Sequence, residues 1–224
     1  MIVSNSLLVV VGAGPGVGAA VARRFGRDGY DAALISHDAG RLEALGKALQ
    51  DEGITAGWTA ADVADEAALR AAVTRFASRE NRIDVLHFNP SAFRQRDPIA
   101  LSVDDLLADV RVGVGGLLVA VQAARPFLSA GARITATGSM AADRPWHQAA
   151  SLGVQKAALR NLVRSLDATL RGDGIRAVSL TVEGTLAPDD EDSAFHPAKV
   201  AEAIWAAAHQ PEDSWRTEVP YPAR

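Results

Sequence analysis

Cysteine is absent from the 224-residue sequence, which excludes disulfides, thiolate metal sites and cysteine nucleophiles. Aromatic residues make up only 5% of the chain, and tyrosine occurs just twice, so phenolic hydroxyls are scarce. No stretch carries a long run of one charge, and the formal net charge is −4. These features give no electrostatic reason to expect nucleic acid or an anionic membrane as a partner.

The rest of the composition is that of an ordinary globular protein. Hydrophobic residues make up 48% and charged residues 22% of the chain, which argues against long disordered stretches. We expect residues 1–224 to form one domain without a metal site. The apolar stretch 1–11 lacks the basic flank and cleavage site of a signal peptide, and no segment approaches the ~20 apolar residues of a membrane span. The expectation is a cytoplasmic protein.

Short apolar runs alternate with longer helical patterns along the chain. Residues 7–11 are continuously apolar, which is typical of a strand buried on both faces of a parallel sheet. Val17, Val21 and Phe25 then recur at helical spacing. The further predicted strands are 32–36, 54–60, 83–88, 133–137, 175–182 and 215–219. This alternation predicts a Rossmann-like, doubly wound parallel sheet of about seven strands with helices on both faces.

Polar and proline residues mark where several helices should begin. Asp65 is placed to cap a helix, and Ser102 opens a long helix to about residue 127. Another helix is predicted over residues 148–170. Pro197 suits the first turn of a final helix that runs to about residue 209.

The first strand is followed at once by the glycine-rich turn Gly12, Gly14, Gly16 and Gly18, with Val17 opening the first helix. Glycines let the backbone approach a pyrophosphate closely, and the helix N-terminus stabilises its charge. The alternative is a tight strand-to-helix turn without a ligand. The strand–turn–helix context favours a dinucleotide site.

In this context the chain resembles the short-chain dehydrogenase/reductase family over nearly its whole length. Gly12, Gly16 and Gly18 match the family's Gly-x-x-x-Gly-x-Gly motif. Further matching positions, in chain order, are Asp62 and Val63, Asn89 within 88–91, Gly116, Gln122, Pro126, Ser139, Lys156 and Gly184. The order and spacing of these positions together carry the resemblance.

The family's catalytic set is asparagine, serine, tyrosine and lysine, and the positions matched by spacing here hold Gly113, Ser139, Leu152 and Lys156. The resemblance implies that Ser139 polarises a carbonyl and that Lys156 binds the cofactor ribose. In the family the tyrosine moves the proton while a hydride passes to or from the nicotinamide. Leucine has no proton to give. The chain is therefore identified as an atypical member that lacks the catalytic tyrosine.

Three other side chains are candidates for the missing proton donor: His147, Glu183 and Tyr221. His147 lies between Ser139 and Lys156 and titrates near neutral pH, although it would also suit a solvent-exposed loop. Glu183 stands where the family has proline, and desolvation can raise a carboxyl pKa. Tyr221 would have to act from a neighbouring subunit.

The resemblance also implies the cofactor contacts beyond the glycine turn: Ser36, His37, Asp62, Val63, Asn89, Lys156, Gly184, Thr185 and Leu186. The lack of an acid at Ser36, with His37 beside it, favours NADP over NAD. Pro15, where NADP enzymes often carry a basic residue, and Asp38 argue the other way. NADP and NAD both remain open at this point.

These observations support an NAD(P)-dependent oxidoreductase that acts on a small carbonyl or alcohol substrate. The alternative is a non-catalytic dinucleotide-binding protein that serves as a sensor or subunit partner. A third hypothesis, in which only the fold is retained, conflicts with the intact glycine turn. The resemblance further implies a homodimer or homotetramer built through the helices predicted at 102–127 and 148–170.

Overall fold

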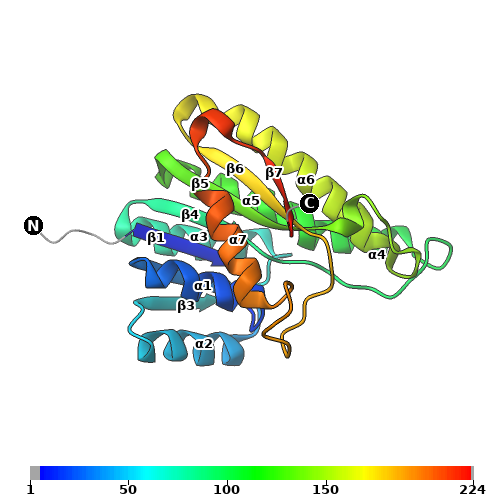
Figure 1. Ribbon diagram of the computed structural model, residues 1–224, viewed down its shortest axis with the longest axis horizontal. Helices are drawn as coiled ribbons and strands as arrows, with labels where there is room; N and C mark the ends of the chain where they lie inside the picture. The colour runs from blue at the N-terminus through cyan, green and yellow to red at the C-terminus, as the bar shows by residue number, and fades with distance from the viewer. Residues whose placement is uncertain (1–5, 223–224) are drawn as a thin grey trace, which may run out of the picture.

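Seven parallel strands form one sheet in the computed structural model, which describes residues 6–222 (Figure 1). The strand order is β3-β2-β1-β4-β5-β6-β7. The strands are β1 (Ser6–Val11), β2 (Tyr30–Ser36), β3 (Ala56–Ala60), β4 (Ile83–Phe88), β5 (Leu128–Ser139), β6 (Arg176–Val182) and β7 (Glu218–Tyr221). This arrangement confirms the predicted fold class.

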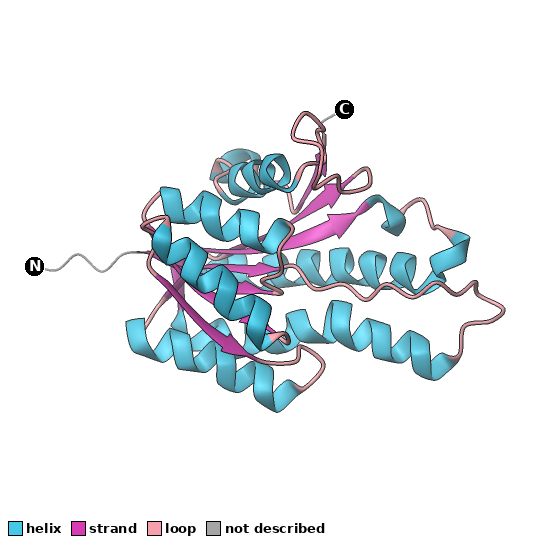
Figure 2. Cartoon of the chain, turned by 90° about the horizontal axis from the view of Figure 1, so that it is seen from below, coloured by secondary structure: helices cyan, strands magenta, loops and turns pink. Residues whose placement is uncertain are grey.

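Helices cover both faces of the sheet (Figure 2). On one face lie α3 (Glu66–Glu80), α5 (Gly116–Ala124) and α6 (Ala150–Leu170). On the other lie α1 (Val17–Arg27), α2 (Ala39–Asp51) and α7 (Pro197–Ala208). The shorter α4 (Val103–Val110) precedes α5.

The first strand shows why its sequence is apolar without interruption. Leu7 and Val9 belong to the core beneath α3, α5 and α6, whereas Leu8 and Val10 belong to the core beneath α1 and α7. Successive side chains of a strand point to opposite faces, so both sets are buried. Each fully buried aliphatic side chain contributes about 1.5–3 kcal/mol. The coverage of β1 on both faces therefore accounts for its uninterrupted apolar sequence.

The chain reverses its direction of winding at β1, which pairs with β2 on one side and with β4 on the other. At its carboxyl end Val11 is level with Ile35 of β2 and with Phe88 of β4. Loops leave such a point in opposite directions and open a crevice above the sheet. This topology fixes where a ligand site can form.

The long helix predicted from Ser102 is present but is not a uniform α-helix. Ser102 caps it, since its hydroxyl accepts a hydrogen bond from the Asp105 amide at 3.1 Å. A π-helical turn at Arg111–Gly115 separates α4 from α5, and a 3₁₀ turn (Arg125–Phe127) follows. The caps predicted at Ser102 and Asp65 are both confirmed.

Within the 25-residue stretch Val103–Phe127, an 18-residue window reaches a mean hydropathy of 1.6, and by length and composition the stretch could cross a membrane. The expectation that no segment approaches such a span was therefore too strong. Within the fold α5 packs against α3 and β4. Length and hydropathy alone do not separate a membrane helix from a core helix of this kind.

Two strand boundaries differ from the predicted ones by three residues or more. β5 begins at Leu128 and not at residue 133. The last strand occupies Glu218–Tyr221, whereas 215–219 was predicted. Trp215 precedes the strand because its ring packs under Arg133 and Arg176, and its indole donates to the Ala177 carbonyl at 3.4 Å.

Gly46 of α2 is predicted to be irreplaceable by alanine. A Cβ atom there would lie 2.0 Å from Cε3 of Trp58 on β3. Gly46→Ala should lower the free energy of unfolding by about 1–3 kcal/mol through overpacking. Gly40→Ala in the same helix is the control, because its Cβ meets nothing closer than 3.7 Å, and it should raise stability by up to about 1 kcal/mol. Equal effects of the two changes in denaturant unfolding would contradict this packing.

Candidate functional site

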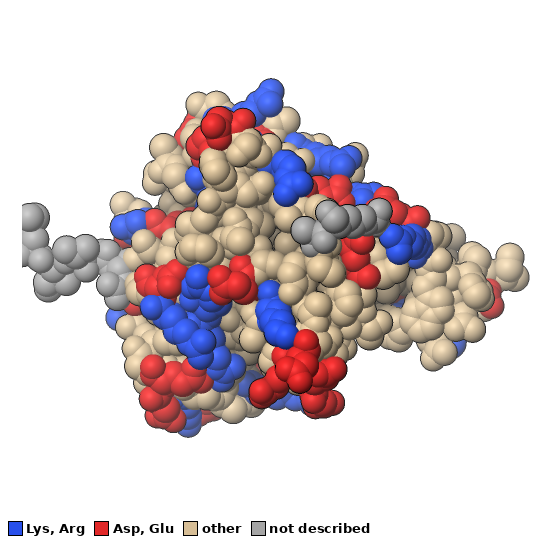
Figure 3. Space-filling model, in the orientation of Figure 1, with Lys and Arg blue, Asp and Glu red and all other residues tan. Residues whose placement is uncertain are grey.

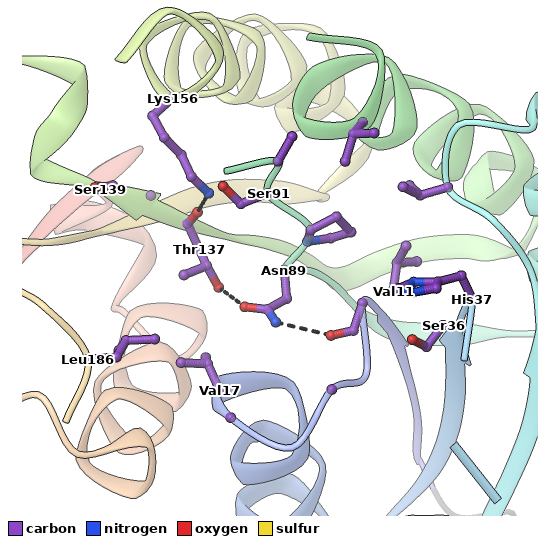
Figure 4. A pocket seen from close by; sticks show the side chains of 18 of the residues that line it. Val11, Val17, Ser36, His37, Asn89, Ser91, Thr137, Ser139, Lys156 and Leu186 are labelled. Carbon is purple, nitrogen blue, oxygen red and sulfur yellow. Dashed lines mark hydrogen bonds between the residues drawn. The ribbon is translucent and has the colours of Figure 1, made fainter. Parts of the chain in front are cut away.

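A cavity of about 740 Å³ opens above the carboxyl ends of the strands. Its lining begins at Ser36 and His37, which follow β2, and passes the glycine turn after β1. It ends at Ser139 of β5 and Val182 of β6 (Figure 4). The cavity therefore lies across the point where the winding of the sheet reverses, as the topology requires.

Two glycines of the turn are needed for its backbone conformation, and two others border the space where a ligand could bind. Gly12 adopts φ +83°, and a Cβ on Gly18 would lie 2.5 Å from the Gly12 carbonyl oxygen, so these two glycines permit the turn itself. Gly14 and Gly16 line the cavity and have no atoms within 4 Å of a Cβ position. Gly16 caps α1 without a side-chain hydrogen bond. Open space over a helix N-terminus suits a pyrophosphate group.

The far end of the cavity, beyond β2 and β3, is lined by Ser36, His37, Asp62 and Val63. This end carries no carboxylate at the tip of β2, because Ser36 occupies that position.

Asp38, which follows His37, is engaged by its own helix. Its carboxylate accepts the Arg41 amide at 3.0 Å as the cap of α2, and it forms an ion pair with the Arg41 guanidinium at 3.2 Å. Its charge is thereby opposed by the helix dipole and by a cation.

A chain of hydrogen bonds connects the glycine turn to the other end of the cavity (Figure 4). Asn89 donates from Nδ2 to the Gly12 carbonyl at 3.0 Å. Thr137 donates from its hydroxyl to Asn89 Oδ1 at 2.9 Å, and Lys156 donates from Nζ to the Thr137 carbonyl at 2.8 Å. The chain crosses β1, β4 and β5 and ends on α6. Asn89 and Lys156 are thus placed together, as predicted, while Thr137 was not anticipated.

His87 lies buried beneath this chain, with Nδ1 2.8 Å from the Thr135 hydroxyl and Nε2 3.4 Å from the Thr137 hydroxyl. Because Thr137 gives its only proton to Asn89, it can only accept from His87. The ring proton therefore sits on Nε2, and Nδ1 accepts from Thr135. Burial, with a smaller effect of Lys156, lowers the pKa of His87 to about 3, so this histidine is neutral.

Lys156 is 5% exposed and lines the cavity. Burial alone lowers the pKa of its amine to about 8, since no carboxylate acts on it. Its single hydrogen bond within the described residues goes to Thr137. A buried ammonium of this kind is poised to change charge close to neutral pH.

Ser139 faces the same end of the cavity. Its Oγ accepts the Ala141 amide at 3.2 Å, so the hydroxyl proton is free to be donated to a ligand oxygen.

Leu152 lies one helical turn before Lys156 and also lines the cavity. No tyrosine lines the cavity as described. Tyr30 packs edge-on against Phe25, and Tyr221 donates its hydroxyl to the Ala194 carbonyl at 2.8 Å.

Gln155 is a residue that sequence reasoning missed. Its side chain is fully buried, accepts from the Ala92 amide at 3.1 Å and donates to the Ala92 carbonyl at 2.8 Å. It fills the space beside Gly113, where an added Cβ would lie 2.2 Å from Gln155 Oε1. The amide thereby holds the cavity-lining loop after β4. The sequence carried no signal for this contact, because only the packing of α6 against the π-helical turn brings the two residues together.

Several predicted residues lie outside the cavity lining. His147 is exposed on a 3₁₀ turn before α6, and Thr185 is exposed after β6. Gly18 packs against the backbone of Gly12 and so shapes the turn without lining the cavity. Glu183 faces a separate polar depression, 3.9 Å from Arg144. The remaining predicted site residues line the cavity: Gly12, Gly14, Gly16, Val17, Ser36, His37, Asp62, Val63, Asn89, Ser139, Lys156, Gly184 and Leu186.

The segment after Gly184 borders the cavity through Leu186 and carries four exposed acids at 189–192. A red cluster lies at this place in Figure 3, below α7. The segment is closed by the bond from the Ala187 amide to the Phe195 carbonyl at 3.1 Å and by the Tyr221 hydroxyl on Ala194. Tyr221 therefore has a structural partner inside its own chain.

The contact between Gly113 and Gln155 yields a prediction for a double-mutant cycle. Gly113→Asn should destabilise by about 1–3 kcal/mol because its side chain collides with Gln155. In the double variant with Gln155→Ala the collision is removed, so the two changes should couple by about 1 kcal/mol or more. Gly115→Asn is the control, since a Cβ there meets nothing closer than 3.8 Å. Strict additivity in urea unfolding would refute the contact.

Comparison with known proteins agrees with this geometry. The short chain dehydrogenase family profile matches residues 6–193. The oxidoreductase UcpA of Escherichia coli (strain K12) is 32% identical over 174 residues, which cover 75% of this chain and only 65% of that protein. Cis-4-hydroxycyclohexanecarboxylate dehydrogenase of Sinomonas cyclohexanicum is 31% identical over 77% of this chain and 70% of its own.

Solved structures show the same likeness. A short chain dehydrogenase from Burkholderia cenocepacia J2315, in complex with NADP, has a TM-score of 0.85 and 29% identity over 96% of this chain and 95% of its own. A dehydrogenase/reductase from Sinorhizobium meliloti 1021 shares the fold with a TM-score of 0.88, at 24% identity over 97% of this chain and 94% of its own. With a glycine turn, a switch-point cavity and Ser139 beside Lys156, the chain belongs to the short chain dehydrogenase family.

Proposed function

We propose that this chain is an NADP-dependent oxidoreductase that interconverts a small carbonyl compound and its alcohol without a catalytic tyrosine. The observation that carries the proposal is that one continuous cavity joins the open glycine turn at one end to Ser139 and Lys156 at the other. A bound nicotinamide cofactor would supply or accept the hydride at the substrate carbon. Ser139 would donate its free hydroxyl proton in a hydrogen bond to the substrate oxygen.

NADP is favoured over NAD by the charges at the end of β2. Ser36 leaves room for a phosphate where a carboxylate would repel it, and His37 lines the same end. Asp38 is held by the α2 N-terminus and by Arg41, which weakens its repulsion of an anion. The NADP found in the Burkholderia relative supports the same assignment.

The substrate would be small and largely apolar at its reacting end. Leu152, Val112, Val182 and Leu186 line the cavity with hydrocarbon. The exposed acids at 189–192 beside it would disfavour an anionic substrate.

A non-catalytic dinucleotide-binding protein is the second candidate. The observation in its favour is Leu152, which leaves no phenol among the described residues that line the cavity. On this hypothesis Lys156 would serve binding alone.

Cofactor choice is tested by calorimetric titration with NADPH and NADH. The parent should bind NADPH more tightly than NADH by about tenfold or more, and Ser36→Asp should reverse the order because its carboxylate repels the phosphate and binds ribose hydroxyls instead. Ser36→Asn, similar in size but neutral, is the matched control and should keep the order. Binding of neither nucleotide would sink the proposal.

Catalysis is tested with a panel of small aldehydes and ketones, by following NADPH oxidation. The parent should turn over at least one substrate slowly, and Leu152→Tyr should raise the rate by about 10²-fold or more by supplying an acid beside Lys156. A parent that binds NADPH yet is silent on the panel, with an active Leu152→Tyr variant, would establish the non-catalytic alternative.

A further inference from the structure

The end of the cavity that is lined by Ser139 contains one titratable side chain among the described residues. Three titratable groups line the whole cavity: His37, Asp62 and Lys156. The first two follow β2 and β3, on the far side of the glycine turn from Ser139. Only Lys156 shares the end where Ser139 would hold a substrate oxygen.

The other groups that could supply a proton are turned elsewhere. His147 is exposed outside the cavity lining, and Glu183 faces Arg144 in the neighbouring depression. The Tyr221 hydroxyl is bonded to Ala194. The Ser91 and Ser139 hydroxyls can form hydrogen bonds in the cavity, but neither ionises at ordinary pH.

Lys156 itself has protons to give. An ammonium carries three N–H donors, and only one is used, on the Thr137 carbonyl. Leu152, one turn earlier on α6, offers no polar atom to take another. Relying on the function proposed above, we infer that Lys156 is the general acid of the reduction and donates its proton directly to the substrate oxygen.

The step balances in atoms and charge. The hydride from the cofactor forms the new C–H bond while the carbonyl π electrons move to oxygen, which takes a proton from Nζ to become the alcohol. Lys156 becomes a neutral amine as the positive charge passes to the cofactor ring, so the total charge of the buried site does not change. The amine then regains a proton from water in the open cavity.

Burial is what shifts the pKa of Lys156, because the ionisable groups of the neighbouring elements are neutral or are paired with other side chains. His87 of β4 is neutral. Asp109 of α4 is held by Arg94 in a two-point contact at 3.1 Å. Asp143 after β5 and Glu218 of β7 both form ion pairs with Arg160 of α6. With a pKa of about 8, the amine is charged below that pH and can act as an acid, and it loses this ability as the pH rises.

The sequence offers an unusually direct spectroscopic test because it contains only three lysines, Lys47, Lys156 and Lys199. Isotope labelling of lysine Nζ gives three side-chain NMR signals, which Lys47→Arg and Lys199→Arg assign. The Lys156 signal should titrate near pH 8 without cofactor. The reductive rate of the parent should fall with rising pH through the midpoint found with NADPH bound.

Two substitutions separate proton donation from binding. Lys156→Arg keeps the charge but holds its proton at all working pH, so it should bind NADPH within about tenfold of the parent yet lose reduction by about 10²-fold or more. Lys156→Ala should be rescued by added alkylammonium ions, with a rate that depends on the pKa of the amine. Ser139→Ala should slow the reaction without moving the pH midpoint.

The outcomes distinguish this inference from the proposed function. Turnover that persists in Lys156→Arg, or a rate that is flat across the NMR midpoint, refutes Lys156 as the acid while the oxidoreductase function stands. NADPH binding without turnover of any carbonyl refutes both the oxidoreductase function and the proton donor. If the protein does not bind NADPH at all, the proposed function is refuted because its cofactor does not bind.

Discussion

The hydrogen bond from Asn89 to the Gly12 carbonyl is the contact on which the site depends. It joins the turn after β1 to the end of β4, the two strands between which the sheet changes its direction of winding. Asn89 passes the connection to Thr137, and the backbone of Thr137 receives Lys156. The region that would hold phosphates and the region that would hold the reacting carbonyl are therefore fixed relative to one another through one partly buried chain of polar groups. Each of these hydrogen bonds requires its partner in one position, which makes the arrangement specific.

The same burial that fixes Lys156 also changes its chemistry. A lysine on a helix surface would stay charged at all physiological pH, but this amine is buried and no carboxylate acts on it, so its charged form is disfavoured. Leu152 adds hydrocarbon where a phenol would have brought a polar partner. On the proposal that Leu152 stands at the position of the family's tyrosine, the leucine does more than remove an acid, because it also leaves the neighbouring amine with protons that no side chain among the described residues accepts.

Gly113 and Gln155 show how one side chain fills space that another residue leaves open. Gly113 has no side chain, and the Gln155 amide occupies the place that a side chain would take. Gln155 then binds both backbone groups of Ala92 and so holds the loop that carries Ser91 into the cavity. An amide therefore lies close to Gly113, and the helix of Lys156 supplies it.

Much of the fold could be read from the sequence because a parallel sheet covered on both faces requires uninterrupted apolar strands, and residues 7–11 meet that requirement. The glycine turn was also within reach, since close backbone approach restricts which residues fit, whereas Ser139 and Lys156 were identified through the resemblance to the family. What only the tertiary structure decided is which side chains meet across different elements. Spacing along a chain assigns His147 to the segment between Ser139 and Lys156, but packing turns it outward, and packing alone brings Gln155 against Gly113 and Lys156 onto Thr137. The physical reason is that periodicity fixes the face of a helix or strand, whereas contacts between elements depend on how those faces fill space.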